Sequence, residues 1–182
     1  DLGAYEVVVG GRTTNPSVKD IAEAVGRAPT PEVVVLPNDG NVAPAARQAA
    51  EMSEKVVGVA PTTSIQQGVA AALAFNAEAD VRANLAAMET AVAAVKSGEV
   101  TTASRDVTLD GVTVVSGEFI GILDGAMVVT GPELSDVLDA VIDAAGAGQD
   151  ELVTVFRGQP VTGQEADAEL ARLAARFDGV EF

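Results

Sequence analysis

The sequence predicts an α/β protein with two lobes. Three short Val-rich runs, each followed by a polar loop and a helical pattern, predict a parallel sheet with helices on both faces in the first lobe. Alternating apolar residues around two Asp-Gly pairs predict a mixed sheet with two β-hairpins and helices in the second lobe. We expect a first α/β lobe over 1–80, a connecting helix over 81–98 and a second α/β lobe over 99–182.

The three Val-rich runs are the expected strands of the first lobe, at residues 7–9, 33–36 and 56–59. The loops that follow them begin at Gly10, Pro37 and Pro61. Because the carboxyl ends of parallel strands lie along one edge of a sheet, these loops are expected to gather where ligands and partners usually bind.

Capping residues mark the helices that follow these loops. The first helix is expected to begin at Asn15 or Ser17. The second contains Pro44, which a helix tolerates only in its first turn. The third has Ser64 and Gln67 at capping-box spacing.

A longer helical pattern runs from about residue 80 to 96 and carries one narrow apolar stripe. We expect this stripe to lie across the first lobe, and the alternative is a dimer seam. The residues of the stripe are Val81, Leu85, Met88, Val92 and Val95.

The second lobe begins with an antiparallel pattern. Asp-Gly pairs at 110–111 and 124–125 are flanked by β-forming residues, which predicts two hairpins. A helix is expected behind Thr130 and Glu133, whose spacing is that of a capping box. A buried strand is expected over 152–156, followed by a last helix that Thr162 and Glu165 cap.

Composition narrows the class of function. The chain has 182 residues, no cysteine, no histidine and a net charge of −16. The missing side chains remove the commonest nucleophile, general base and metal ligands, and the negative charge disfavours nucleic acid and anionic membranes. No apolar run approaches the roughly 20 residues that cross a bilayer. We therefore expect no nucleic-acid partner, no stable membrane insertion and a cytoplasmic location.

The charge is unevenly distributed along the chain. Residues 1–98 hold 11 acidic and 7 basic residues, whereas residues 99–182 hold 16 acidic and 4 basic ones. An electrostatic partner of the second half is expected to present a basic face, although a solubility-promoting surface explains the charge equally simply.

The strand-end loops favour recognition over catalysis. Gly10 and Gly11 belong to no dinucleotide-binding or P-loop pattern, so they form either a tight turn or, with Arg12, an anion site at a helix N-terminus. Ser64 has no histidine to activate it and is expected to be a helix cap. No acidic loop has the spacing of a metal site. The candidate ligand- or partner-binding residues are Arg12, Thr13, Thr14, Asn15, Asn38, Asn41, Thr62, Thr63 and Ser64.

Several of these loops together resemble a known family. The motifs are GGRTTNPS at 10–17, LPN at 36–38 with Asn41, PTTSIQQG at 61–68, AFN at 74–76, GEFIG at 117–121 and LVTVF at 152–156. Nearly the whole chain is similar to the C-terminal domain of the fatty acid kinase A subunit, the YloV-type proteins with a dihydroxyacetone-kinase-like N-terminal domain.

The resemblance implies a two-component kinase. An upstream domain, outside this sequence, binds ATP and magnesium, and a middle region makes the parent protein a homodimer. A DegV-type carrier subunit presents the fatty acid, whose carboxylate becomes an acyl phosphate. The domain resembled here docks that carrier, shares its DegV-like fold and needs no cofactor of its own. The chain is expected to begin inside a longer protein and to stop before the last strand of the family.

Three functions remain open at this point. The leading hypothesis is a non-catalytic carrier-docking domain. The alternative is a DegV-like module that itself binds a fatty acid or small anion, with Thr62, Thr63 and Ser64 at the carboxylate and Arg12 or Arg105 nearby. A free-standing enzyme is disfavoured because the chain has no P-loop, histidine or cysteine.

Overall fold

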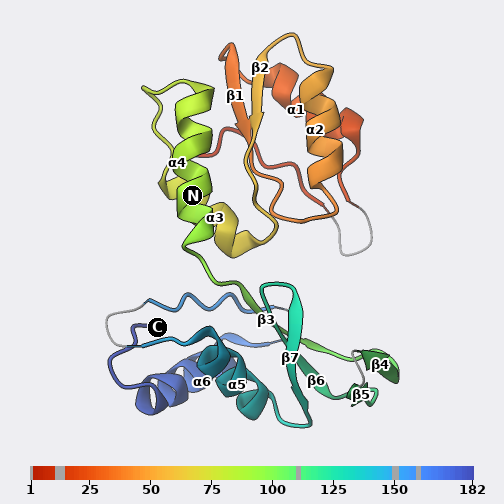
Figure 1. Cartoon of the computed structure of the whole chain (residues 1–182), viewed down its shortest axis with the longest axis vertical. Helices are drawn as coiled ribbons and strands as arrows, with labels where there is room; N and C mark the ends of the chain where they lie inside the picture. The colour runs from red at the N-terminus through yellow and green to blue at the C-terminus, as the bar shows by residue number, and fades with distance from the viewer. Residues whose placement is uncertain (1, 11–14, 110–111, 149–151, 159–160) are drawn as a thin grey trace. The chain divides into compact units, whose positions relative to one another are not determined.

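The computed structural model describes residues 2–10, 15–109, 112–148, 152–158 and 161–182. It divides into two compact units, Asp1–Val95 and Lys96–Phe182, which are described separately below (Figure 1). Helices and strands of both kinds occur in each unit, so the α/β class is confirmed. No helix in the described ranges is long and apolar enough to cross a membrane.

The first unit is built on two parallel strands, in which Val34 lies opposite Gly58. Its elements in chain order are α1 (Val18–Arg27), β1 (Glu32–Val35), α2 (Ala43–Glu51), β2 (Val56–Val59), α3 (Ile65–Leu73) and α4 (Val81–Ala93). Ser17, Ser64 and Asp80 each cap the helix that follows through a side-chain hydrogen bond. The predicted cap at Ser64 and the place of Pro44 in the first turn of α2 are confirmed.

Helices cover both faces of this sheet, as Figure 1 shows. Alternate strand residues, among them Val33 and Val57, pack with α1 and α2, because successive side chains of a strand point to opposite faces. Val34 and Leu36 pack with α3 and α4 on the other face. At Gly58 an added Cβ would lie 2.5 Å from a methyl group of Val81, so α4 approaches the sheet closely there.

The apolar stripe of α4 is part of the core of the first unit. Met88 and Val92 are buried against Ala60 and Ala71. The stripe thus lies across the first unit, which is the expected arrangement, and these two side chains are not available to a dimer seam.

A buried amide fastens the start of α4 to the loop before it. Asn84 is 2% exposed. Its Nδ2 donates to the carbonyl oxygens of Asn76, Ala79 and Asp80, at 2.9, 3.0 and 3.1 Å. Its Oδ1 accepts from the backbone N–H of Asn76 at 2.7 Å. The loop over 76–80 therefore takes its shape from a single side chain.

The prediction of a strand over residues 7–9 is wrong for the described structure. Val7 and Val9 are 74% and 84% exposed, and no strand is formed there. Glu6 forms an ion pair with Arg27, and the hydroxyl of Tyr5 donates to the carbonyl oxygen of Arg27. These contacts hold the segment at the end of α1. β-forming side chains do not make a strand without a neighbour to pair with.

The second unit contains an antiparallel sheet in the order β3-β6-β7 and a separate hairpin of β4 and β5. Both predicted hairpins are confirmed. Asp124 and Gly125 have φ angles of 48° and 83°, as a tight turn of this kind requires, and residues 110–111 lie outside the described residues. The elements are β3 (Gly98–Thr102), β4 (Val107–Leu109), β5 (Val112–Val114), β6 (Phe119–Leu123), β7 (Ala126–Gly131), α5 (Leu134–Ala145) and α6 (Gly163–Arg176).

Helix α5 packs on this sheet over two glycines. An added Cβ at Gly121 would lie 2.5 Å from methyl groups of both Val129 and Val141, and one at Gly98 would lie 2.8 Å from Val141. Val137 and Val141 are buried in this contact. The close approach of α5 therefore depends on the missing side chains.

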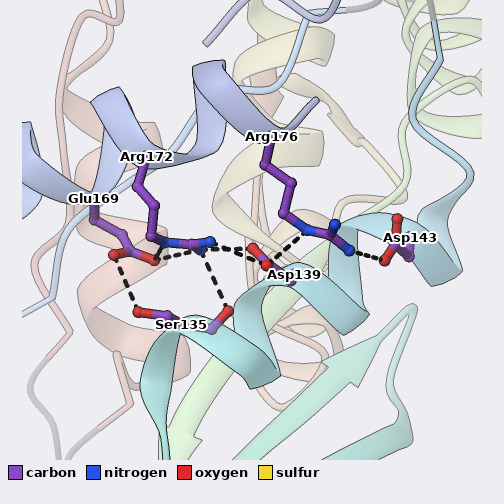
Figure 2. A network of polar contacts seen from close by, with 6 residues as sticks. All are labelled: Ser135, Asp139, Asp143, Glu169, Arg172 and Arg176. Carbon is purple, nitrogen blue, oxygen red and sulfur yellow. Dashed lines mark hydrogen bonds and ion pairs between the residues drawn. The ribbon is translucent and has the colours of Figure 1, made fainter. Parts of the chain in front are cut away.

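Two arginines of α6 join it to α5 (Figure 2). Arg172 donates to both carboxylate oxygens of Asp139, at 3.0 and 2.5 Å, and to Glu169 at 2.7 Å. Arg176 reaches Asp139 at 2.7 Å and Asp143 at 2.8 Å. The bonds to Asp139 and Glu169 raise the pKa of Arg172. Asp139 thus links both arginines, which is a stronger arrangement than an isolated surface pair.

Two expectations for the second unit are wrong. Thr130 lies in β7, and α5 begins at Leu134 with Glu133 as its N-cap and no side-chain cap bond. The run over 152–156 is not a buried strand, because Leu152 is 67% exposed and forms a single parallel bridge with Glu181. A run of β-forming residues needs partners along its length, and the described residues supply one for this run, at Leu152.

Capping boxes begin α1 and α6 and give the protein a predicted pH dependence. Hydrogen bonds from Ser17 lower the pKa of Asp20, and hydrogen bonds from Thr162 lower the pKa of Glu165. Their stabilising contribution is therefore complete above the ordinary carboxyl pKa of about 4 and is lost as the pH falls through the lowered value. We expect Asp20→Asn and Glu165→Gln to flatten the loss of stability between pH 5 and pH 2, measured by urea unfolding at each pH. An unchanged slope would contradict this assignment.

Candidate functional site

The loops that follow β1 and β2 meet at the carboxyl ends of the two strands. The backbone N–H of Asn38 donates to Oγ1 of Thr62 at 3.1 Å. Thr62 is 1% exposed, the most buried polar residue of this region. The predicted approach of these two loops is therefore present in the first unit, and a buried threonine joins them.

Asn38 adopts a conformation that few residues other than glycine tolerate. Its φ is 57°, in the left-handed region where asparagine is enriched. Its side chain lies against Gly68 of α3, where an added Cβ would be 2.1 Å from Oδ1 of Asn38. That Oδ1 is buried and has no hydrogen-bond partner among the described residues. The absence of a side chain at Gly68 is thus what lets the asparagine amide occupy this position.

The contact between Gly68 and Asn38 gives a specific prediction. Gly68→Ala normally favours a helix by about 1 kcal/mol. Here the new methyl group displaces the Asn38 amide, which costs about 1–3 kcal/mol. We expect no net gain in stability and a large amide shift at Thr62 in an ¹⁵N–¹H NMR spectrum. Gly26→Ala is the matched control, because space is open at that helical glycine and a gain of about 1 kcal/mol is expected there. A stabilised Gly68→Ala protein with an unmoved Thr62 signal would refute the argument.

The other polar residues of the two loops form bonds close to themselves in sequence. The N–H of Asn41 donates to Oδ1 of Asp39 at 2.7 Å, a local turn. The N–H and hydroxyl of Thr63 both donate to Oε1 of Gln67, at 2.8 and 3.0 Å. Oγ of Ser64 accepts from the N–H of Gln67 at 3.2 Å. Ser64 is thus a helix cap, as expected.

The structure brings only some of the nine candidates together. Asn38, Thr62, Thr63 and Ser64 lie at the ends of β1 and β2 or at the start of α3, and Asn41 is exposed in the loop before α2. Asn15 is exposed immediately before α1, away in sequence from both of these loops. Arg12, Thr13 and Thr14 lie outside the described residues.

A hollow of about 350 Å³ opens beside the two loops. Its lining combines a strand end, the loop at Pro61 and one face of α2: Ala43, Arg47, Val59, Ala60, Pro61, Thr62 and Thr63. Arg47 is a candidate that the sequence did not single out. The available signal was its place in the helix after the second strand-end loop, four residues beyond Ala43, which puts both on one face.

A second hollow, of about 500 Å³, has a different character. It lies between β2 and the first half of α4, and its lining includes three carboxylates, Glu32, Asp80 and Glu89, with one cation, Arg82. The N–H of Val81 donates to Glu32 at 2.8 Å, so one of these carboxylates already serves the start of α4.

The chemistry of the strand-end site is that of hydrogen-bond donors and one cation. The described residues contain no group of three His, Cys, Asp or Glu side chains that could hold a metal ion. Arg47 and the hydroxyls of Thr62 and Thr63 suit the binding of an anion or of a partner's polar groups.

Comparisons with known proteins agree with the motifs of these loops. The model of the FakA-like C-terminal family, the C-terminal domain of proteins like the A component of fatty acid kinase, matches residues 1–182. Protein YloV of Bacillus subtilis is 36% identical over 180 residues, which are 99% of this chain and 32% of that protein. Uncharacterized proteins of Staphylococcus haemolyticus and Staphylococcus aureus are each 30% identical over 180 residues, 99% of this chain and 33% of theirs.

The fold defines an α/β domain of two compact units with polar loops at the strand ends of the first. The chain belongs to the FakA-like C-terminal family of fatty acid kinase, which confirms the resemblance seen in its motifs. It spans about a third of the length of the curated relatives that it matches.

Proposed function

We propose that this chain is the docking domain of a fatty acid kinase component. It binds a DegV-type carrier protein loaded with a fatty acid, so that a nucleotide-binding domain elsewhere in the same polypeptide phosphorylates the acyl carboxylate. The observation that carries the proposal is the match of the C-terminal family over residues 1–182.

The geometry of the first unit supports a role in recognition. Asn38 and Thr62 join two strand-end loops into one polar rim, where open α/β sheets usually bind their ligands and partners. Asn41 and Thr63 are exposed beside them. Their hydroxyl and amide groups suit hydrogen bonds with a partner's backbone and provide no activated nucleophile.

Charge supports a partner with a basic face. Residues 99–182 hold 16 acidic and 4 basic residues. Opposite charge on the carrier accelerates encounter and fixes orientation more than it adds affinity. We expect association with the carrier to slow as the ionic strength rises.

The proposal extends to the parent protein. ATP and magnesium bind in its N-terminal domain, the parent is a homodimer, and the pair acts in the cytoplasm on fatty acids destined for phospholipid synthesis. The chain described here contributes docking and no catalytic group.

A binding measurement tests the docking proposal. The 182-residue chain is titrated with its cognate carrier, loaded with fatty acid, in an isothermal calorimeter. We expect a saturable complex with a Kd below tens of micromolar. We expect Asn41→Tyr, which places a bulky ring on the rim and keeps the backbone bond to Asp39, to weaken it at least tenfold.

Thr90→Tyr is the matched control. Thr90 is exposed on α4, and its hydroxyl donates to the carbonyl oxygen of Ala86 in the same helix. We expect this variant to bind like the unchanged protein. Absence of a complex at tens of micromolar would reject docking. Equal weakening by both variants would reject the rim as the docking surface.

A further inference from the structure

We propose that the 350 Å³ hollow beside Arg47 is an oxyanion site that holds one carboxylate or phosphate group. The inference does not rest on the proposed docking of a carrier, because it concerns a small ligand bound by this chain alone. The hollow is defined by α2, the end of β2 and the loop at Pro61, all within the first unit.

Arg47 supplies the charge. Three other cations of the first unit are engaged elsewhere: Lys19 pairs with Glu23, Arg27 pairs with Glu6, and Lys55 donates to the last carbonyls of α1. Arg47 has no carboxylate or carbonyl partner among the described residues. A guanidinium is well suited to two parallel hydrogen bonds with a carboxylate or phosphate.

Thr62 supplies a buried hydroxyl at the same hollow. Its oxygen accepts the N–H of Asn38, which leaves the hydroxyl hydrogen to be donated. Within the described structure no acceptor takes that hydrogen, although the side chain is 1% exposed. A buried donor without an acceptor is costly, and an anion in the hollow would satisfy it. Thr63 adds a second hydroxyl to the lining.

The electrostatics of the lining favour an anion in a chain that is otherwise acidic. The protein holds 27 acidic and 11 basic residues, yet the described residues that line this hollow include one cation and no carboxylate. The 500 Å³ hollow of the same unit has three carboxylates and one arginine. An anion entering beside Arg47 therefore avoids the repulsion that the other hollow presents.

The apolar part of the lining limits what accompanies the anionic group. Ala43, Val59, Ala60 and Pro61 offer a short aliphatic surface beside the polar groups. A phosphate ion and the carboxylate end of an aliphatic acid share the required chemistry, so the test separates these two sources.

The experiment is an NMR titration of the ¹⁵N-labelled 182-residue chain at constant ionic strength and pH. Sodium phosphate, sodium butyrate and sodium octanoate are the three probes. We expect saturable shifts at the amides of Thr62 and Thr63 and at Nε of Arg47 with at least one probe. Saturation by phosphate alone identifies a phosphate site, and saturation by butyrate or octanoate identifies a carboxylate site.

Variants decide whether Arg47 carries the binding. We expect Arg47→Gln to weaken the affinity at least tenfold and Arg47→Lys to weaken it less. Arg82→Gln, in the lining of the other hollow, removes the same charge and is expected to leave the affinity unchanged. The proposal fails if no probe saturates, or if Arg47→Gln and Arg82→Gln behave alike.

Discussion

Replacing Gly121 with valine is expected to destabilise the second unit by about 3 kcal/mol. Gly121 lies in the middle of β6, and methyl groups of Val129 and Val141 are 2.5 Å from the position of its missing Cβ. Neither neighbour can withdraw easily, because Val141 lies on α5 and is buried against the sheet. A close-packed interior resists added volume by shifting backbone or forcing strained rotamers. Urea unfolding, with amide hydrogen exchange to report on each unit separately, measures the effect.

Gly163→Ala is the control in the same unit. Gly163 is the first residue of α6, and space is open around it. We expect its substitution to be neutral or slightly stabilising, since alanine favours helices. If Gly121→Val unfolded at the same urea concentration as the unchanged protein, the close packing of α5 on β6 would be wrong.

Replacing Asn84 with leucine is expected to destabilise the first unit by about 3 kcal/mol or more, because several buried groups lose one shared partner. Leucine has nearly the same shape but leaves the N–H of Asn76 and the carbonyls of Asn76, Ala79 and Asp80 without the side chain that they now share. Each buried group left unsatisfied costs about 1–3 kcal/mol. Hydrogen exchange of the Asn76 amide should rise first, because that N–H loses its acceptor directly.

Thr90→Ala is the control on the same helix. Its hydroxyl is exposed and bonds within α4, so a change of about 0.5 kcal/mol or less is expected. A leucine variant as stable as this control would show that the buried amide does not hold the loop over 76–80.

The helices and hairpins were predictable from sequence because their signals are local. Ser17, Ser64 and Thr162 cap helices through bonds to residues three positions ahead. Asp124 and Gly125 make their turn through their own backbone angles. Strand pairing is not local, and the two runs over 7–9 and 152–156 show the consequence. Both have β-forming residues, but whether they join a sheet depends on partners elsewhere in the chain, which no window of sequence reveals.

The candidate site was predictable in part. The approach of the loops after β1 and β2 follows from parallel strands, and the bond from Asn38 to Thr62 joins them. Arg47 was missed because helical arginines are common on surfaces and nothing local distinguishes one beside a hollow. Gly68 was missed because its importance lies in the Asn38 side chain packed against it, 30 residues earlier in the chain.

The arginine network between α5 and α6 has a consequence outside the fold. Arg172 and Arg176 are two of the four basic residues in 99–182, and their charge is directed at Asp139, Glu169 and Asp143. Little positive charge is left to offset the remaining carboxylates. The exterior of this half should act as a weak cation exchanger that concentrates potassium ions and lysine-rich peptides around itself.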